Sequence, residues 1–565
     1  MKGKALRCSK STGCEENMRL AQRWVSECLG AHPGCSVIDG RATLPTRILD
    51  LEPSSSSDDV RLVMTNGATG QYLTLSHVWG QTQLIRTTLS TLSQHLESIP
   101  LNNLPPTFKD AVAVGRSLGI RNLWIDSLCI IQDSREDWVA ESGKMGEYYR
   151  NSLFTIAAVS ATDSKGGCFM DRNSLSTTPS FIKFHLPREY QRDEPVSCFL
   201  RPAIGWDPAD ETVNFQRPPL WQRAWVLQER LLSCRILCFS DVQMSWKCLS
   251  GEASERVPEG TGVRVNMSES ETLIRDMLSG KATYNISHIS QSQLFTTPDR
   301  LPTTTGQLLK FYNAWYDLLM LYGRCGLTKA GDILPAMSGI AKLASIATGD
   351  QYLAGLWRHD THRGLLWTAP DSTSSRTDLR VYRAPTWSWA SLPASSSFYV
   401  RQVLLADIVR TDMFEIQQAS VVASSINPFG EVSGGRLIVK TRLKLAQPGG
   451  LPAEEEAFQG LGTDRSEPTL FDLNAGHSVG YFFADNIDRR YLSEVWCCPV
   501  LVEERASLYA TEGEEANHQP LQAEARCLVL FPIDVSERVY MRVGLAWILD
   551  YEWFEDTEST VISII

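Results

Sequence analysis

The clearest pattern along the chain is an alternation, beginning at Tyr72, of short apolar segments with longer amphipathic ones. The apolar segments 72–76, 122–126 and 153–159 have the length of strands, and the last is apolar on both faces, as a strand covered on both sides must be. The segments between them carry apolar residues at helical spacing. This β-α-β-α-β order predicts an α/β domain in which the three strands are parallel neighbours in a doubly wound, mainly parallel sheet.

The first predicted helix begins near Thr107, which has the spacing of a capping box with Asp110. In that arrangement the two side chains bind each other's backbone amides and start the helix. The second helix begins at Ser134, with Asp137 in its first turn, where an acidic side chain is favoured.

A third helix is predicted at 221–230, which reads WQRAWVLQER. Trp221, Trp225 and Glu229 are spaced at i, i+4 and i+8, so they would share one helix face. A carboxylate on a tryptophan face is costly to bury unless it is paired or used in chemistry. Glu229 therefore has two interpretations: half of a buried ion pair with Arg86 or Arg223, or a carboxylate that binds a ribose or stabilises an oxocarbenium-like centre.

The rest of the pattern divides the chain into four regions. An N-terminal preface (1–70) precedes the α/β domain (71–255), and a linker with a helical segment (256–380) precedes a β-rich C-terminal region (381–565). The polar stretch 251–305 is expected to be an irregular surface excursion, and helical periodicity returns over 306–348. Strand-like runs in the last region are 386–391, 436–443, 480–485, 526–532 and 540–548.

Composition narrows the function classes. With 565 residues, 43% hydrophobic and 21% charged, the chain is globular and has more than one domain. Its net charge of −11 argues against general binding to nucleic acid or anionic membranes. We expect no membrane span and no secretory signal, hence a cytoplasmic protein whose 14 cysteines are free, metal-bound or reactive rather than paired.

Candidate chemistry lies where the predicted parallel strands end, because ligands of open α/β sheets bind beyond the carboxyl ends of the strands. His77 follows the first strand, and Asp126 and Cys129 follow the second, so these three are candidate catalytic residues together with Glu229. A Cys129–His77 nucleophile pair is chemically conceivable. The structural alternative is that Asp126 caps a turn, His77 binds backbone and Cys129 fills core. The candidate ligand-binding residues are Ser76, Trp79, Gly80, Trp221, Arg223, Trp225 and Gln228.

The preface contains one group of residues that could bind a metal. Cys28-x3-His32-x2-Cys35 offers three ligands, with Cys8 or Cys14 as a fourth. The spacing is not a standard zinc pattern, and Pro33-Gly34 is typical of a turn. We therefore expect the side chains to point apart and to hold no metal.

Four stretches together resemble the heterokaryon incompatibility (HET) domain family of filamentous fungi. They are YLTLSHVWG (72–80), LPPTFKDAVAVGRSLGIRNLWIDSLCIIQD (104–133), EDWVAESGKMGEYYRNSLFTIAAVSATDSKGGCF (136–169) and WQRAWVLQER (221–230). The resemblance implies a role in non-self recognition and programmed cell death after fusion of incompatible cells. It also implies a fold similar to the Toll/interleukin-1 receptor (TIR) domain.

Some TIR domains cleave NAD with a glutamate that follows a tryptophan by four residues, a spacing that Trp225 and Glu229 reproduce. The resemblance thus makes NAD a candidate substrate. It leaves open an accessory enzyme of a biosynthetic pathway acting on another small molecule, and an interaction module without chemistry. It also leaves the protein partner open, a second copy of the chain included.

Overall fold

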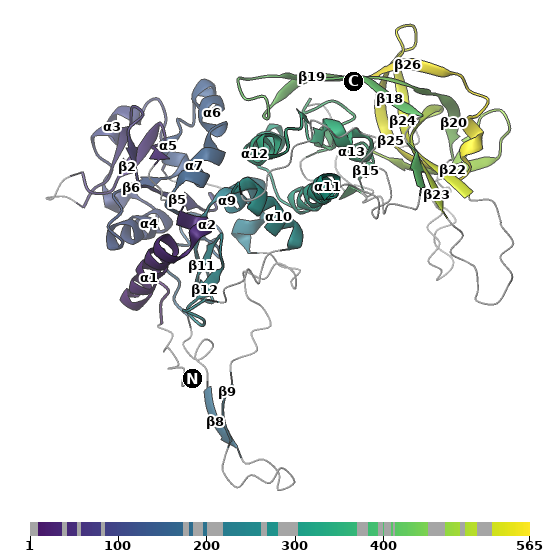
Figure 1. Ribbon diagram of the computed structural model, residues 1–565. Coiled ribbons are helices and arrows are strands. Elements are labelled where there is room, and N and C mark those ends of the chain that lie inside the picture. The colour runs from purple at the N-terminus through teal and green to yellow at the C-terminus, as the bar shows by residue number, and fades with distance from the viewer. Residues whose placement is uncertain are drawn as a thin grey trace, which may run out of the picture. The chain divides into compact units, whose positions relative to one another are not determined.

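The computed structural model describes sixteen ranges of the 565-residue chain. They are 10–36, 42–53, 58–80, 85–172, 180–184, 196–200, 218–260, 268–280, 303–369, 382–393, 399–400, 408–410, 413–449, 469–485, 492–505 and 522–565. The chain divides into two compact units, residues 1–281 and 282–565. Each unit is described by itself (Figure 1).

An eight-stranded sheet forms the centre of the N-terminal unit, in the order β12-β11-β10-β7-β5-β6-β2-β3. Its strands are β2 (Arg47–Asp50), β3 (Arg61–Met64), β5 (Leu73–Ser76), β6 (Asn122–Trp124), β7 (Phe154–Ala158), β10 (Arg235–Phe239), β11 (Met244–Cys248) and β12 (Glu252–Ser254). The four central strands, β10, β7, β5 and β6, are parallel. Both edges are antiparallel, so the sheet is mixed, and the expectation of a mainly parallel sheet holds only for its centre.

The predicted pairing of the first three strands is confirmed. In β5, Leu73 lies opposite Leu123 of β6 and opposite Phe154 of β7, and both pairings are parallel. Every residue of β5 and β7 is buried, which is the consequence of covering both faces of a central strand.

Helices lie on both sides of this sheet (Figure 1). They are α1 (Glu15–Ala31), α2 (Pro33–Ser36), α3 (Leu92–Glu97), α4 (Pro106–Ser117), α5 (Asp126–Cys129), α6 (Arg135–Ser142), α7 (Met145–Asn151), α9 (Ala224–Leu232) and α10 (Glu269–Leu278). On one face, Leu73 and Leu75 of β5 share a core with Phe108 and Ala111 of α4. On the other face, Thr155 of β7 is hydrogen-bonded to the side chain of Ser233, which ends α9 (2.6 Å).

The expected capping box of α4 is absent. The helix begins at Pro106, and no side chain caps it. Thr107 Oγ1 instead accepts from the amide of Gly167, and Asp110 Oδ2 accepts from the amides of Cys168 and Phe169 (2.7 and 3.0 Å). The two side chains thus bind backbone amides of the loop after β7 and not the amides at the start of α4. By contrast, Ser134 caps α6 by accepting from the amide of Asp137 (3.2 Å), as predicted.

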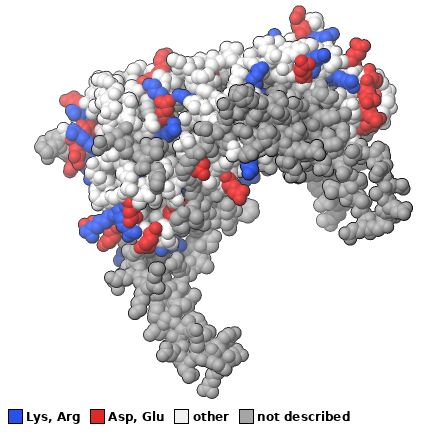
Figure 2. All heavy atoms as spheres, in the orientation of Figure 1, with Lys and Arg blue, Asp and Glu red and all other residues white. Residues whose placement is uncertain are grey.

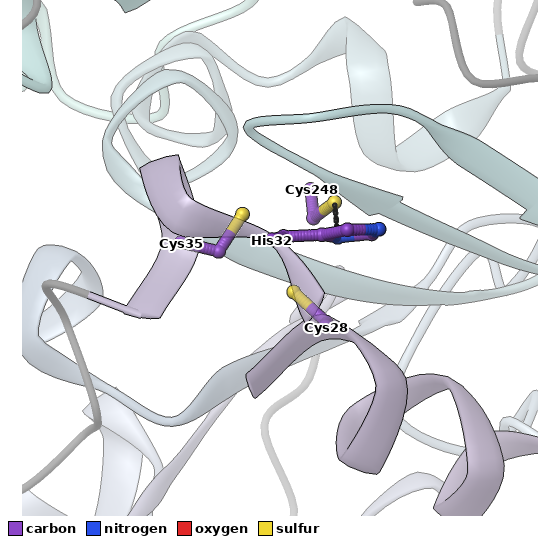
Figure 3. A group of neighbouring side chains, drawn as sticks. All are labelled: Cys28, His32, Cys35 and Cys248. Carbon is purple, nitrogen blue, oxygen red and sulfur yellow. Dashed lines mark hydrogen bonds between the residues drawn. The ribbon is translucent and has the colours of Figure 1, made fainter. Parts of the chain in front are cut away.

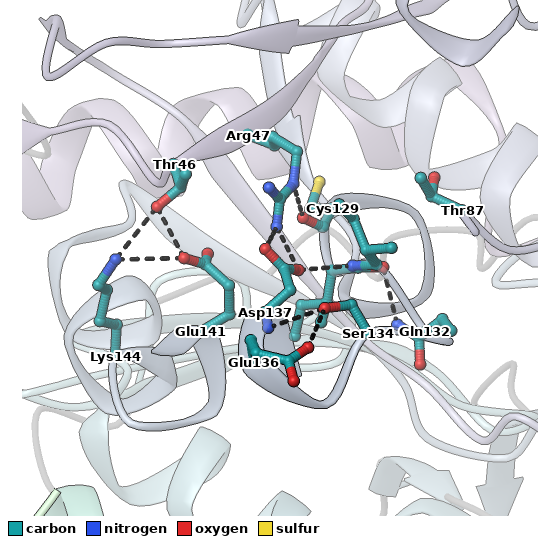
Figure 4. A network of polar contacts seen from close by, with 12 residues as sticks. Thr46, Arg47, Thr87, Cys129, Gln132, Ser134, Glu136, Asp137, Glu141 and Lys144 are labelled. Atoms are coloured by element: carbon teal, nitrogen blue, oxygen red, sulfur yellow. Dashed lines mark hydrogen bonds and ion pairs between the residues drawn. The ribbon is translucent and has the colours of Figure 1, made fainter. Parts of the chain in front are cut away.

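The preface is built into the domain rather than appended to it, because β2 and β3 extend the sheet. Buried Arg47 of β2 forms an ion pair with Asp137 of α6 (2.5 Å) and donates through Nε to the carbonyl of Cys129 (2.7 Å). Asp137 also accepts from the amide of Ile131 (2.7 Å). Figure 4 shows this network joining β2 to the loop between α5 and α6.

The stretch expected to be an irregular excursion contains a helix, α10. Ser268 and Glu271 form a full capping box at its start. Glu271 also pairs with Arg230 of α9, so the helix is held against the domain. Two short antiparallel pairs complete the unit: β1 (Ala42–Thr43) with β4 (Thr69–Gly70), and β8 (Ser180–Phe184) with β9 (Val196–Leu200).

The C-terminal unit joins helices to a β-barrel. The helices α11 (Thr303–Gly323) and α12 (Ser338–Thr348) confirm the predicted helical segment, and a short helix, α13 (Thr361–Gly364), follows. Six strands close a ring in the order β23-β20-β21-β22-β25-β24. They are β20 (Lys444–Pro448), β21 (Thr469–Asp472), β22 (Ser478–Ala484), β23 (Val495–Arg505), β24 (Gln522–Asp534) and β25 (Val539–Ile548). The same sheet continues through β17 (Ile408–Arg410), β18 (Phe414–Ala423), β19 (Val432–Arg442) and β26 (Ser559–Ile564).

Four of the five strand-like runs expected here lie in β19, β22, β24 and β25. The run 386–391 was wrong: it forms turns and a 3-10 helix (Trp389–Ser391). Ser388 Oγ accepts from the amide of Ala390 and donates to the carbonyl of Ala354, which favours a local turn over a strand.

On the face drawn in Figure 2, Lys and Arg side chains are interspersed with Asp and Glu side chains over the described residues. That face of the described residues therefore offers no continuous basic surface for a polyanion. None of the helices in the described ranges combines the length and the apolar character needed to cross a membrane.

Candidate functional site

The segment after β5, from His77 to Gly80, is held in place from three sides. Trp79 donates through Nε1 to Asp126 Oδ2 (2.8 Å), and its carbonyl accepts from Ser164 (3.3 Å). Gly80 has a φ of +77°, and a Cβ there would lie 2.5 Å from Cβ of Asp163. The segment thus requires glycine at its end, and it presents a half-buried Trp79 beside a carboxylate.

The helix that follows the proline-containing stretch begins later than its sequence predicts. Trp221 lies in a 3-10 turn (Pro219–Gln222), and α9 starts at Ala224 with Arg223 as its N-cap. Only Trp225 and Glu229 therefore share an α-helix, and the expected three-residue face is wrong. Arg223 turns toward the sheet, where its Nη1 donates to the carbonyl of His77 (2.6 Å).

Glu229 is a buried acid with a strongly raised pKa. It is 5% exposed, and its Oε2 has no hydrogen-bond partner of good geometry in the described part of the chain. Burial raises the pKa of Glu229 to about 7, against the lowering effects of the Ser76 hydroxyl, Arg223 and Tyr149, while the charge of Asp126 raises it further. The carboxyl and the carboxylate are then both well populated near neutral pH.

The alternative of a buried ion pair is not supported within the described residues. Glu229 forms no ion pair there with either Arg86 or Arg223, and Arg223 instead donates to the backbone carbonyl of His77. Arg223 acts on Glu229 through its charge over a longer distance. A buried carboxyl without a close cation explains why burial dominates its pKa.

Four other groups act on Glu229, namely Ser76, Asp126, Tyr149 and Arg223. Asp126 begins the short helix α5, so β6 ends at Trp124 and not at Asp126. Burial raises the pKa of Asp126, although Arg223 and the hydrogen bond from Trp79 oppose this. Tyr149 of α7 donates to the carbonyl of Leu75 (3.1 Å), and burial followed by the nearby charge of Glu229 raises its pKa. We call Ser76, Asp126, Tyr149, Arg223 and Glu229 the Glu229 cluster.

The structure does not bring His77 and Cys129 into this cluster as working groups. The ring of His77 packs edge-on against Phe108 of α4, with centroids 5.0 Å apart. Burial and the charge of Arg223 lower the pKa of His77 to about 3, so it is neutral at physiological pH. Burial raises the pKa of Cys129 to about 12, which keeps its thiol protonated and unreactive.

The remaining candidate ligand-binding residues, Trp221, Trp225 and Gln228, differ in how far they are exposed. Trp225 is half-buried, whereas Gln228 is fully buried in α9. Trp221 is 8% exposed and packs in an apolar cluster with Leu220 and Val226, with the guanidinium of Arg230 over its ring (5.6 Å). Trp221 is therefore a core residue. Tyr149 was missed by the sequence, because nothing in its local pattern relates it to Glu229.

The prediction that the side chains of Cys28, His32 and Cys35 point apart is also wrong. The ligand atoms of Cys28, His32, Cys35 and Cys248 all lie within 4.8 Å of one another. Cys14 is not among them, and Cys8 lies outside the described residues. Cys248 is 216 residues from His32, so no local spacing could have revealed it.

Chemically, the Glu229 cluster places two carboxyl groups of raised pKa beside one guanidinium. Such a pair can hold one group protonated and the other ionised near neutral pH, which suits general acid–base work and the stabilisation of a developing cation. The cation of Arg223, half-buried at the surface, suits a phosphate.

Comparison with protein families gives one match: residues 72–229 fit the family described as heterokaryon incompatibility protein (HET). The matched range begins directly before β5 and ends at Glu229, so it contains the whole Glu229 cluster. Searches of curated proteins and of solved structures gave no match.

Proposed function

We propose that the chain, which carries a heterokaryon incompatibility domain over residues 72–229, acts in the cytoplasm of a fungus in non-self recognition and programmed cell death. The family match supports the process. The reaction is inferred from the Glu229 cluster, which we assign to cleavage of the nicotinamide–ribose bond of NAD. A TIR-like organisation of the domain agrees with the parallel β-α-β-α-β centre of its sheet.

One observation carries this assignment. Glu229 is 5% exposed and Oε2 has no hydrogen-bond partner in the described residues, yet it lies beyond the carboxyl end of β5, where ligands of such sheets bind. The Ser76 hydroxyl, at the end of that strand, interacts with the Glu229 carboxyl and lowers its pKa. Buried polar atoms are almost always satisfied, so the unsatisfied Oε2 of Glu229 supports a site whose natural partner is a ligand.

The proposed step uses Arg223 and Glu229 of the cluster together with the rings of two tryptophans beside it. Arg223 attracts the diphosphate, and the half-buried rings of Trp79 and Trp225 offer faces on which a base can stack. The glycosidic bond breaks as nicotinamide leaves with the bonding electron pair, and the ionised carboxylate of Glu229 stabilises the positive charge that develops on the ribose. Water then adds to that carbon and loses a proton, which gives ADP-ribose.

The test is inducible expression of wild type and Glu229→Gln in a fungal host, with viability and NAD content followed together. The amide keeps the shape and removes the charge, so NAD loss should fall at least about 100-fold while the protein stays folded. Glu136→Gln is the matched control, because Glu136 is exposed on α6 and outside the cluster, and it should retain wild-type killing and NAD loss.

Other outcomes assign other functions. A stable Glu229→Gln protein that kills fully would contradict any catalytic role and leave a protein-interaction module. Wild-type killing with unchanged NAD, abolished by Glu229→Gln, would point to a different small molecule at the same cluster, as an accessory biosynthetic enzyme would need.

A further inference from the structure

Four sulfur and nitrogen ligands meet where the preface touches the edge of the sheet. Cys28 lies in the last turn of α1, His32 follows that helix, and Cys35 lies in α2. Cys248 is the last residue of β11. Figure 3 shows the side chains of Cys28, Cys35 and Cys248 grouped around the ring of His32.

The distances suit a tetrahedral metal. Zinc–sulfur bonds of about 2.3 Å and zinc–nitrogen bonds of about 2.0 Å place neighbouring ligand atoms roughly 3.5 to 3.8 Å apart in a tetrahedron. Cys248 Sγ lies 3.5 Å from His32 Nδ1, and no pair among the four ligand atoms exceeds 4.8 Å. Only a small contraction separates this arrangement from a bound geometry.

Neighbouring donors are directed at the sulfur atoms. The amide of Ser250 donates to Cys248 Sγ (3.4 Å), and the hydroxyl of Ser250 lies 3.6 Å from Cys35 Sγ. Arg235 Nε donates to Cys28 Sγ (3.3 Å). Thiols are weak acceptors, whereas thiolates bound to a metal accept such hydrogen bonds well and are oriented by them.

Arg235 also balances the charge. Its side chain is fully buried in β10, directly opposite Cys248 in the ladder, and it donates to the carbonyl oxygens of Cys35 and Leu153. A divalent cation with three thiolates and one neutral imidazole carries a net charge of −1, and a single guanidinium neutralises it. Burying a cation among three neutral thiols would be far less favourable.

We propose that Cys28, His32, Cys35 and Cys248 bind one Zn²⁺ as a structural site. Three thiolates and an imidazole favour zinc over Mg²⁺ or Ca²⁺, which prefer oxygen ligands. Four protein ligands fill the tetrahedron and leave no open position for a reaction. His32 is partly exposed and, with Cys248, borders a cavity of about 100 Å³ that gives the metal a route in.

The zinc would join two parts of the chain that sequence separates widely. The metal would tie the end of α1 and the turn after it to β11. Trp24 of α1 already donates to the carbonyl of Pro258, in the segment that follows β12 (2.8 Å). The proposed zinc site has a structural role and takes no part in the reaction assigned to the Glu229 cluster. The two proposals can therefore be tested independently. The cysteines in the described ranges form no disulfide, so these thiols are free to bind.

The first experiment measures metal in the full-length wild-type protein, purified without chelator, by inductively coupled plasma mass spectrometry. We expect about one zinc per chain. After removal of zinc under reducing conditions, Co²⁺ should restore one equivalent with the intense visible bands of tetrahedral thiolate coordination. These two measurements need no variant and so do not depend on a mutant folding.

Variants then assign the ligands. Cys248→Ser should abolish stoichiometric zinc, and Cys28→Ser should do the same, although the two lie in distant parts of the sequence. Cys238→Ala is the matched control, because Cys238 is also buried in the sheet but belongs to an apolar cluster away from the four ligands, and it should retain one zinc.

Wild-type protein without zinc that also fails to bind Co²⁺ after reduction would overturn the proposal. Loss of two free thiols on titration of the unreduced, denatured wild-type protein, with no such loss in Cys248→Ser, would identify a disulfide that involves Cys248 and would also overturn the proposal. Zinc retained in full by Cys248→Ser would reject the tertiary assignment.

Discussion

Replacing Glu229 by Gln should make the stability of the N-terminal unit less sensitive to pH. Burial raises the pKa of Glu229 from 4.5 to about 7, so the folded protein binds this proton more tightly than the unfolded chain does. Between pH 4.5 and about pH 7 the free energy of unfolding therefore falls as the pH rises, and above about pH 7 this group causes no further change. The difference between 4.5 and about 7 corresponds to about 3 kcal/mol.

The variant lacks the titrating group, so its free energy of unfolding should rise relative to that of the wild type by about 3 kcal/mol between pH 4.5 and pH 8. The new amide must find its own hydrogen bonds, which shifts stability by the same amount at every pH. The change of the difference with pH is thus the diagnostic quantity. For a unit of this size we expect a relative shift of about 6 °C in thermal midpoint, at about 2 °C per kcal/mol.

The assay is thermal and urea unfolding of the full chain at pH 5, 6, 7 and 8, followed by tryptophan fluorescence. The protein has two compact units, so the transition that responds to the substitution is the one analysed. Glu141→Gln is the matched control. Glu141 is 2% exposed but accepts from Thr46 and Tyr148 (2.8 Å each) and pairs with Lys144.

The control should lose about 1–3 kcal/mol near neutral pH, because donors to its carboxylate lose a charged acceptor. A Glu229→Gln variant whose disadvantage grows as the pH rises would refute the reasoning. It would show that a cation compensates the Glu229 carboxylate in the folded protein.

Three other substitutions test backbone strain and buried ion pairs. Gly80→Ala should lower the free energy of unfolding, measured in urea, by about 2–3 kcal/mol, because φ is +77° and the new Cβ would overlap Asp163. Gly67→Ala has a similar φ but open space around its Cβ, so it should lose only about 1–2 kcal/mol. Arg47→Ala should cost about 3–5 kcal/mol and release the preface, seen as faster hydrogen exchange in β2, since it leaves a carboxylate of its ion pair uncompensated. Arg363→Ala should lower the free energy of unfolding of the C-terminal unit by about 3–5 kcal/mol, because its partner carboxylate, Asp360, is fully buried. An unchanged unfolding midpoint for either arginine variant would show that its ion pair does not stabilise the fold.

Regular elements with a strong local signal could be predicted from the sequence. The segments 72–76, 122–126 and 153–159 are apolar and separated by helical periodicity, and their parallel pairing follows from the right-handed crossovers that such an order requires. The helix cap at Ser134 and the helices α11 and α12 are likewise local properties.

Predictions failed where a tertiary contact or a backbone constraint overrode the helical spacing of the side chains. Thr107 and Asp110 have capping spacing, yet the amides of 167–169 take both side chains. Trp221 has helical spacing to Trp225, but Pro218 and Pro219 begin a 3-10 turn and α9 starts only at Ala224. In each case the free energy of a tertiary hydrogen bond or a backbone constraint exceeds a propensity of a few tenths of a kcal/mol.

The chemistry of the two sites depended still more on tertiary structure. The sequence alone identified Glu229 and Asp126, and it identified Cys28, His32 and Cys35, because these residues lie in recognisable local patterns. The raised pKa of Glu229 arises from burial and from groups on β5, α5, α7 and the start of α9, so it exists only once these segments are packed together. The fourth sulfur, Cys248, joins the other ligands only because β11 and α1 meet in the fold, and no pattern within either segment encodes that meeting.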